Sequence, residues 1–108
     1  MKNKKKYKIK FIANGPDFES FEQDFDLNGL PNGVVCGYFK NGDFSYKGNY
    51  EKGLKQRQFI YYYRNGKIRS TVNYLDNKLQ GYKIDFDEKG NIKWKTKYLN
   101  GQEIKENE

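Results

Sequence analysis

The chain of 108 residues contains no histidine and a single cysteine, Cys36. Histidine is the commonest general base and metal ligand, so its absence removes the usual signature of a hydrolytic or metal site. One cysteine excludes an internal disulfide and a zinc site built from several cysteines. We therefore expect no enzymatic activity, no cofactor and no bound metal.

Long apolar runs are also missing. No stretch approaches the ~20 apolar residues that a membrane-spanning helix needs. A basic start is followed by "YKIKFIANG", in which Lys8 and Lys10 interrupt the apolar stretch that a signal peptide requires. We expect a soluble, cytoplasmic protein.

Hydrophobic residues make up only 35% of the chain and the mean hydropathy is −1.13, yet 18% of the residues are aromatic. Tyr and Phe favour strands, and each ring buries a large area. Eleven glycines against two prolines, with many asparagines, indicate frequent turns. This composition predicts a single, thin β domain whose core is built from rings.

The formal net charge is +7. Four of the lysines lie in residues 1–6, which we expect to be a disordered basic tail, and the remaining chain carries +3. A basic protein attracts acidic partners and disfavours strongly basic ones.

A regular repeat runs through the chain. Gly42, Gly66 and Gly90 lie one 24-residue period apart. Further columns with the same period are Tyr50, Tyr74 and Tyr98; Gly53, Asn77 and Gly101; Tyr38, Tyr62 and Phe86; and Phe44, Ile68 and Ile92. Agreement of five columns without an insertion indicates a repeat protein.

Each unit is a strand, a tight glycine turn, a second strand and a return turn. The expected strands are 34–39, 43–50, 58–63, 67–74, 82–87 and 91–98. Short turns require antiparallel neighbours, and Asn77 can adopt the left-handed conformation that glycine adopts in the other return turns. The fold class predicted is an all-β, single-layer antiparallel meander of about eight strands.

The repeat sets the expected boundaries. Three hairpin units cover 33–56, 57–80 and 81–101, and 102–108 is expected to fray. Residues 7–32 are expected to form a degenerate amino-terminal cap, with strands at 7–12 and 18–27 and a turn at 14–16. Terminal repeats are atypical because one edge must be closed.

Two hairpin registers are compatible with the second unit. A three-residue loop with a glycine bulge pairs even with even positions; it sends Tyr62 to the core, together with Cys36 of the first unit, and Phe59, Tyr61 and Tyr63 to the opposite face. A two-residue Asn65-Gly66 turn pairs odd with even positions and buries Tyr61 and Tyr63 instead. We adopt the first because it fits the third unit, where Tyr82, Ile84 and Phe86 alternate with charged residues.

The stretch "GDFSYKGNYEKG" (42–53) resembles the MORN repeat, whose mark is Tyr-x-Gly-x-aromatic after a glycine turn; Tyr46, Gly48 and Tyr50 fill it here. The later units look more like a divergent bacterial variant, with Ser70 and Trp94 in place of the tyrosine. Proteins with that variant are often described as the antitoxin or immunity partner of a toxin. MORN repeats in general are linked to scaffolding and to acidic phospholipids. The resemblance covers about 33–104 and implies binding, without catalytic residues.

The candidate binding site is a patch of aromatic and basic residues expected on the face opposite the core. It consists of Phe39, Phe59, Tyr61, Tyr63, Arg64 and Arg69. Tyr and Arg are enriched at interface hot spots, and an exposed aromatic group of this size indicates a partner. The alternative is that the amino-terminal segment 7–27 covers it.

Three further patterns have weaker support. Lys67, Arg69, Lys93, Lys95 and Lys97 suggest a basic platform for nucleic acid, but Asp85, Asp87 and Glu88 lie near them and can pair with them. "DFDLNG" (24–29) opens like a calcium loop, yet Val35 occupies the closing glutamate position. The three carboxylates lack a cleft for acid–base chemistry.

These observations predict a protein-binding module. The resemblance makes an antitoxin or immunity protein, which neutralises a toxin by occluding its surface, the first hypothesis. A scaffold or adaptor at acidic phospholipid membranes is the second, and nucleic acid binding is not expected. Because like charges slow encounter and weaken binding, the partner surface should be acidic or near neutral.

Overall fold

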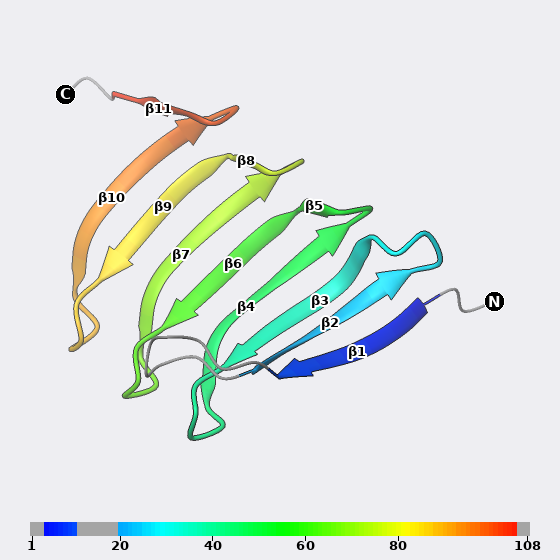
Figure 1. Ribbon diagram of the computed structural model, residues 1–108. Coiled ribbons are helices and arrows are strands. Elements are labelled where there is room, and N and C mark those ends of the chain that lie inside the picture. The colour runs from blue at the N-terminus through cyan, green and yellow to red at the C-terminus, as the bar shows by residue number, and fades with distance from the viewer. Residues whose placement is uncertain (1–3, 11–19, 106–108) are drawn as a thin grey trace.

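The computed structural model describes residues 4–10 and 20–105, with side chains from Phe21 to Lys105. In these residues the fold is one open antiparallel sheet in which strands follow one another in chain order (Figure 1). Its strands are β1 (Lys4–Lys10), β2 (Ser20–Asp26), β3 (Pro31–Tyr38), β4 (Phe44–Glu51), β5 (Leu54–Lys55), β6 (Arg57–Tyr62), β7 (Ile68–Leu75), β8 (Lys78–Leu79), β9 (Gly81–Phe86), β10 (Ile92–Leu99) and β11 (Gln102–Ile104). The predicted all-β meander is confirmed. The described part of the chain holds no helix long and apolar enough to cross a membrane.

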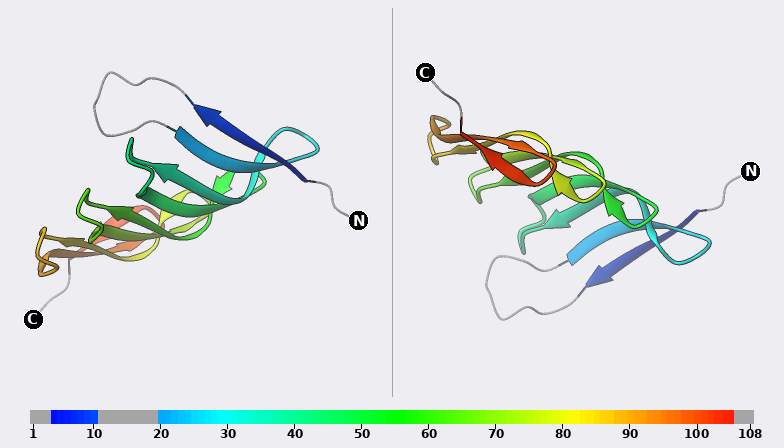
Figure 2. Two further views of the ribbon diagram at one scale, coloured as in Figure 1. Left: turned by 90° about the horizontal axis from the view of Figure 1, so that it is seen from below. Right: turned by 90° about the horizontal axis from the view of Figure 1, so that it is seen from above.

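The sequence repeat is visible in the strands. The hairpins β3–β4, β6–β7 and β9–β10 follow one another across the sheet, and the short strands β5, β8 and β11 begin at the same position of each unit. Seen along the sheet, the long strands are bowed, and the described residues form a single curved layer without a second sheet against it (Figure 2). The layer must therefore bury its rings against its own backbone and against neighbouring rings.

The hairpin turns have the three-residue form with a glycine bulge. The Gly66 N–H donates to the Tyr63 carbonyl at 3.0 Å, and the Tyr63 N–H donates to the Lys67 carbonyl at 2.8 Å. Equivalent bonds close the turns at 39–43 and 87–91. The glycine has a positive φ in all three (94°, 91° and 99°), which explains the glycine column.

The return turns have two central residues, both with positive φ, as type I′ turns require. They are Lys52-Gly53 (50° and 86°), Asp76-Asn77 (49° and 74°) and Asn100-Gly101 (54° and 89°). The left-handed Asn77 predicted from sequence is confirmed.

A column of side-chain amides fixes each return turn to the preceding repeat. The backbone N–H of Asp76 donates to Gln56 Oε1 at 2.9 Å, and that of Asn100 donates to Gln80 Oε1 at 2.8 Å. Asn32 receives the same bond from the Lys52 N–H at 2.8 Å. The three amides occupy one column of the repeat, so the return turns are joined to one another at a fixed spacing.

The predicted register of the second unit is correct next to the hairpin turn and wrong in the rest of the strand pair. Tyr62 pairs with Ile68, as the three-residue loop requires, but Tyr61 pairs with Ser70, so Arg69 is an extra residue in β7. The same shift lies between Tyr38 and Gly37 in the first unit and between Ile92 and Trp94 in the third. A bulge of this kind changes parity and moves every following side chain to the other face.

The consequence is that Phe59 and Tyr61 lie on the core face, here defined by Val35, Phe59 and Val72. Phe59 is 2% exposed and is the most buried large side chain of the described residues. Tyr62, predicted to be core, packs with Phe44 on the opposite face, the second face. Cys36 is also on the second face, because it pairs with Lys47 and is only partly buried.

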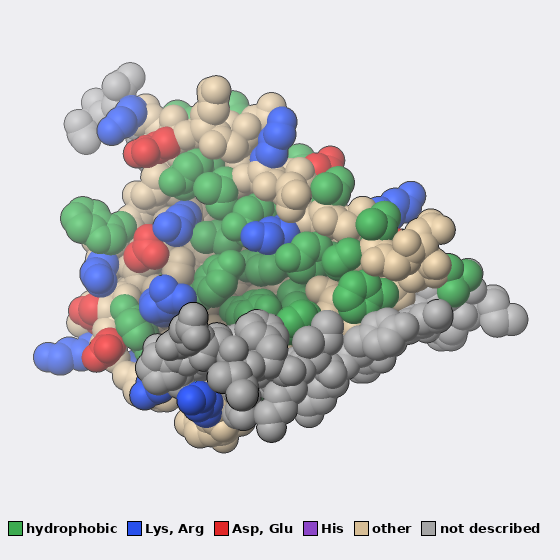
Figure 3. All heavy atoms as spheres, in the orientation of Figure 1, with side chains coloured by type: hydrophobic (Ala, Val, Ile, Leu, Met, Phe, Trp, Pro, Cys, Tyr) green, Lys and Arg blue, Asp and Glu red, His purple; other side chains and the backbone are tan. Residues whose placement is uncertain are grey.

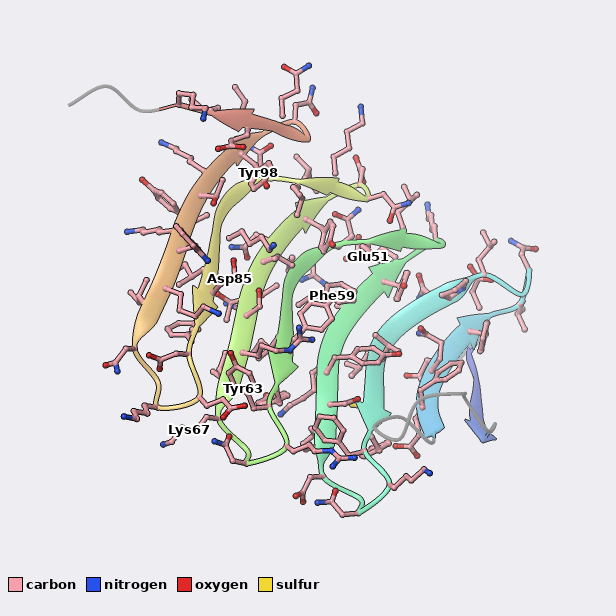
Figure 4. The ribbon with its side chains drawn as sticks, turned by 60° about the vertical axis from the view of Figure 1, so that its left-hand side comes forward. Glu51, Phe59, Tyr63, Lys67, Asp85 and Tyr98 are labelled. Carbon is pink, nitrogen blue, oxygen red and sulfur yellow. The ribbon has the colours of Figure 1, made fainter. Side chains whose placement is uncertain are left out.

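The core is organised around the Phe59 ring, which lies over the middle strands (Figure 4). Tyr50 and Tyr74 contact it edge-on, with centroids 5.8 and 5.3 Å away. Gly48 leaves the space that the ring occupies, since a Cβ there would overlap the ring carbons of Phe59. Tyr46 occupies the corresponding space over Gly37.

Two expected boundaries also differ. Lys4, Lys5 and Lys6 belong to β1 and pair with Asp26, Phe25 and Asp24, so they are not part of a tail. Residues 102–104 form β11, which pairs with the end of β10, in place of the expected frayed segment. The turn predicted at 14–16 lies outside the described residues, as do 1–3 and 106–108.

We expect Gly48→Ala to lower the free energy of unfolding by about 2 kcal/mol or more, because overpacking a filled core forces ring and backbone to shift. Urea denaturation of the purified chain measures this. In a Phe59→Leu background the same change should cost less, because the smaller side chain leaves room for the methyl group. An unchanged midpoint for Gly48→Ala in the wild-type background would contradict this account of the core.

Candidate functional site

A hollow of about 640 Å³ lies near the hairpin turns of the first and second units, and its lining includes Tyr46 and Tyr61 of the core face. We call it the tyrosine hollow. It is lined by Phe39, Ser45, Tyr46, Tyr61, Tyr62, Tyr63, Arg64, Arg69 and Glu88. Apolar side chains gather over the middle strands of the sheet in Figure 3, and Tyr63 lies toward the hairpin end in Figure 4.

The register shift builds this hollow. Ser45 and Arg69 are the extra residues of the first two hairpins, and each lies beside a core-face residue, Tyr46 and Ser70 respectively. Arg69 is thereby brought to Tyr61, with its guanidinium carbon 5.7 Å from the ring centroid. The bulge thus places the polar side chain of Arg69 beside the aromatic rings of the core face.

Four tyrosines line the hollow, and the hydroxyls of two of them, Tyr46 and Tyr61, have raised pKa values and stay protonated. Burial raises the pKa of Tyr61 to about 12, and the neighbouring tyrosines Tyr74, Tyr50 and Tyr46 add to the rise while Arg69 opposes it. Burial also raises the pKa of Tyr46. Neutral phenols of this kind donate hydrogen bonds and offer apolar ring surface, and they are poor bases.

The rim is held across two repeats. The Tyr63 hydroxyl donates to the Phe86 carbonyl at 2.5 Å, and Asn65 Nδ2 donates to the Glu88 carbonyl at 3.0 Å. These bonds tie the turn of the second hairpin to that of the third, so the fold itself fixes the position of the Tyr63 ring in the lining.

A buried hydroxyl in the lining, Ser45 Oγ, has no hydrogen-bond partner among the described residues. Ser70 Oγ, on the strand position opposite Tyr61, shares this property. Buried polar groups are nearly always satisfied, so these two hydroxyls are exceptions among the described residues.

The structure brings together five of the six residues predicted as the site, namely Phe39, Tyr61, Tyr63, Arg64 and Arg69. Phe59 does not belong to the lining, because it is the centre of the core. Sequence reasoning missed Ser45, Tyr46, Tyr62 and Glu88 as site residues. The signal that could have found Ser45 is that it shares a repeat column with Arg69, a residue of the predicted site.

The basic platform predicted from Lys67, Arg69, Lys93, Lys95 and Lys97 is divided between the two faces. Arg69 lies on the core face against Tyr61, whereas Lys95 and Lys97 lie 4.5 and 5.5 Å from the Tyr82 ring on the second face. Of the three carboxylates expected beside it, Asp85 is bridged at 3.8 Å by Lys83 of its own strand. Arg69 therefore does not share a face with Lys95 and Lys97.

The second face carries its own aromatic row. Phe44 stacks on Tyr38 at 5.3 Å and lies 6.3 Å from Tyr62, and the Lys47 ammonium sits 4.3 Å from the Phe44 centroid. The Tyr38 hydroxyl donates to Glu22 Oε1 at 2.6 Å, and this bond to a carboxylate, more than burial, raises the pKa of Tyr38 to about 12.

The calcium-like segment forms a turn closed by its own side chain. Asp26 Oδ1 accepts the N–H groups of Asn28 and Leu30 at 2.9 and 3.0 Å. Asp87 caps the third hairpin turn in the same way, and these backbone bonds lower the pKa of its carboxyl.

Comparison with known proteins gives no assignment: no family model, no curated protein and no solved structure matches this chain.

The raised pKa of Tyr61 has a consequence for stability. A phenol with a folded pKa of about 12, against an ordinary 10.0, stabilises the fold below pH 10, and this contribution is lost as the pH rises toward 12. We expect the free energy of unfolding of wild type to fall more steeply between pH 9 and 12 than that of Tyr61→Phe, measured by urea denaturation. Tyr62→Phe, from the same strand but the second face, controls for the loss of one phenol. Parallel curves for wild type and Tyr61→Phe would contradict the buried position of this hydroxyl.

Proposed function

We propose that this protein is a binding module that recognises another protein through the tyrosine hollow. The observation that carries the proposal is the convergence of Phe39, Tyr61, Tyr63 and Arg69 from two neighbouring hairpins around one cavity of about 640 Å³. Tyr and Arg are enriched among the hot spots of protein interfaces, which cluster in well-packed pockets. The hollow accepts one large apolar side chain of the partner as an anchor.

The charges around the hollow define the partner surface. The lining contains Arg64 and Arg69 against one carboxylate, Glu88, and the whole chain carries +7. The phenols of Tyr46 and Tyr61 stay neutral, so they add no negative charge. A carboxylate beside the apolar anchor therefore fits, and the partner surface is acidic or neutral there.

The chemistry of the hollow supports binding more than catalysis. The chain has no histidine, and its one cysteine, Cys36, lies on the second face. Tyr61, with its pKa raised to about 12, cannot act as a base near neutral pH. Ring surface, neutral hydroxyls and guanidinium groups hold a ligand without transforming it.

The resemblance of the repeats to those of bacterial antitoxin and immunity proteins suggests the kind of partner. A toxin with an acidic or neutral surface, neutralised by occlusion, is the candidate that we propose. The fixed rim, in which Tyr63 and Asn65 bond to the third hairpin, suits such tight recognition.

A second candidate function rests on the second face. Lys47 lies 4.3 Å from the Phe44 ring and Lys95 lies 4.5 Å from the Tyr82 ring. Ile92, in the same repeat column as Phe44, is 60% exposed. Cations flanked by exposed apolar groups suit an anionic lipid surface, as expected for a MORN-type scaffold or adaptor.

The test is affinity capture from the native cell, comparing wild type with Arg64→Glu/Arg69→Glu. We expect one protein retained by wild type, and its measured binding constant to weaken at least about tenfold in the variant, because hot-spot groups are reversed in charge. Arg57→Glu is the matched control, since Arg57 is exposed and lies away from the hollow. All variants must keep the circular dichroism of wild type.

Either of two results would overturn the protein-binding function. The first is a retained protein that binds the double variant as tightly as wild type. The second is capture of no protein together with salt-sensitive binding to anionic vesicles, lost in Lys47→Glu/Lys95→Glu, which would support the lipid alternative.

A further inference from the structure

The strand at the carboxyl-terminal end of the sheet has an open edge. β11 pairs with Lys97, Tyr98 and Leu99 only, so within the described residues the segment 92–96 of β10 is paired on one side, by β9. An edge of this kind presents a row of backbone N–H and C=O groups that can pair with another strand.

The repeat shows what occupies this position elsewhere. In β4, Tyr46 and Lys47 pair with Tyr61 and Ile60 of β6. In β7, Ser70 and Thr71 pair in the same way with Asp85 and Ile84 of β9. The equivalent positions of β10 are Trp94 and Lys95, and Trp94 is 67% exposed. A strand placed here would continue the sheet with the register that the first two units already use.

The other end strand, β1, has the same residue pattern as β10. Residues 6–10 read Lys-Tyr-Lys-Ile-Lys and residues 93–97 read Lys-Trp-Lys-Thr-Lys. Both alternate lysine with an aromatic and then a β-branched residue. The partner of β1 is known from the sheet, so it indicates what a strand of this pattern pairs with.

That partner is β2, which alternates acidic and aromatic residues. The register sets Lys4, Lys6 and Lys8 opposite Asp26, Asp24 and Glu22. It also sets Ile9 opposite Phe21. Positions directly opposite in an antiparallel pair share a face, so the lysine positions of β1 are matched to acidic positions of β2.

We propose that the outer edge of β10, at residues 92–96, binds an extended segment of another protein that alternates acidic and aromatic residues. The segment adds an antiparallel strand to the sheet. Its carboxylates lie beside Lys95 on the second face. Its rings lie beside Trp94 on the core face, as Tyr61 lies 6.1 Å from Tyr46 within the sheet.

A second copy of this chain does not fit the edge. Both end strands are lysine-rich, so joining two β10 edges, or β10 to β1, sets lysines opposite lysines, which is destabilising. The acidic strand β2 is paired on both sides, by β1 and β3. The occupant is therefore a different protein with an exposed acidic strand or tail.

This site is separate from the tyrosine hollow, whose lining includes no residue of β10. The two proposals therefore fail independently. Arg64→Glu/Arg69→Glu should leave strand addition unchanged, and changes in β10 should leave partner capture through the hollow unchanged.

The probe for the test is the peptide SFEQDFD, which copies residues 20–26, added to the ¹⁵N-labelled full chain. We expect chemical-shift changes and slowed amide exchange confined to residues 92–96 and their neighbours in β9. The control peptide SFQQNFN, with every carboxylate replaced by an amide, should bind at least about tenfold more weakly, because the cross-strand charge pairs are lost. The peptide SFEPDFD, which breaks the hydrogen-bond ladder, should not bind.

A charge reversal makes the test specific. Lys95→Glu should lose at least about tenfold affinity for SFEQDFD and gain affinity for SFKQKFK. Lys95 is exposed, so the variant should keep the wild-type circular dichroism. The proposal is overturned by equal binding of SFEQDFD and SFQQNFN, by shifts confined to residues 4–10, or by no shift at millimolar peptide.

Discussion

The structure depends on one packing constraint, which is that a single-layer sheet must bury its rings against its own backbone. Phe59 meets this constraint by lying on Gly48, between the edges of Tyr50 and Tyr74. A residue with a Cβ at position 48 would lift the ring into solvent, and the described residues supply no second layer to cover it. The low hydropathy and high aromatic content of the chain follow from this arrangement, since a few large rings supply the core that many aliphatic side chains supply in a sandwich.

The bulge that follows each hairpin turn decides which rings take part in that core. One extra residue, Ser45 or Arg69, reverses the parity of the strand, so that Phe59 and Tyr61 lie on the core face while Tyr62 joins Phe44 on the other. The same residue carries a polar group onto the core face. The core and the tyrosine hollow thus have a common origin, and the basic face expected from sequence alternation is split because the alternation itself is interrupted.

The repeat made the strand order, the positions of the turns and the left-handed Asn77 predictable, because glycine and asparagine have conformational preferences that depend on local sequence alone. The bulge was not predictable in the same way. Ser45, Arg69 and Lys93 share a column but no side-chain chemistry, and a bulge in the middle of a strand needs no special residue. The register error followed from this, and it placed Phe59 and Tyr61 on the wrong face while leaving five of the six site residues together. The 24-residue spacing of Asn32, Gln56 and Gln80 was visible in the sequence. Their bonds to the return turns were not predictable, because they depend on the distance in space between successive repeats.

The three repeats share one backbone arrangement but carry different surfaces, because the core is concentrated in the first two. Along the columns of the core face, Phe59 becomes Lys83, Tyr61 becomes Asp85 and Ser70 becomes Trp94 in the third unit. The ring cluster therefore stops at the third hairpin, where Lys83 and Asp85 form an ion pair and Trp94 stands exposed. This ion pair joins two positions of the same strand, so the third hairpin is held to the second by its ladder to β7 and by the bonds of Tyr63 and Asn65 to its turn. Because the third unit does not bury the ring cluster, its side chains can differ from those of the first two units and form the proposed binding edge of β10. The first two units keep the tyrosine hollow rigid. Aromatic residues of the second unit are thus replaced by charged residues in the third, and this replacement separates the tyrosine hollow from the proposed edge of β10.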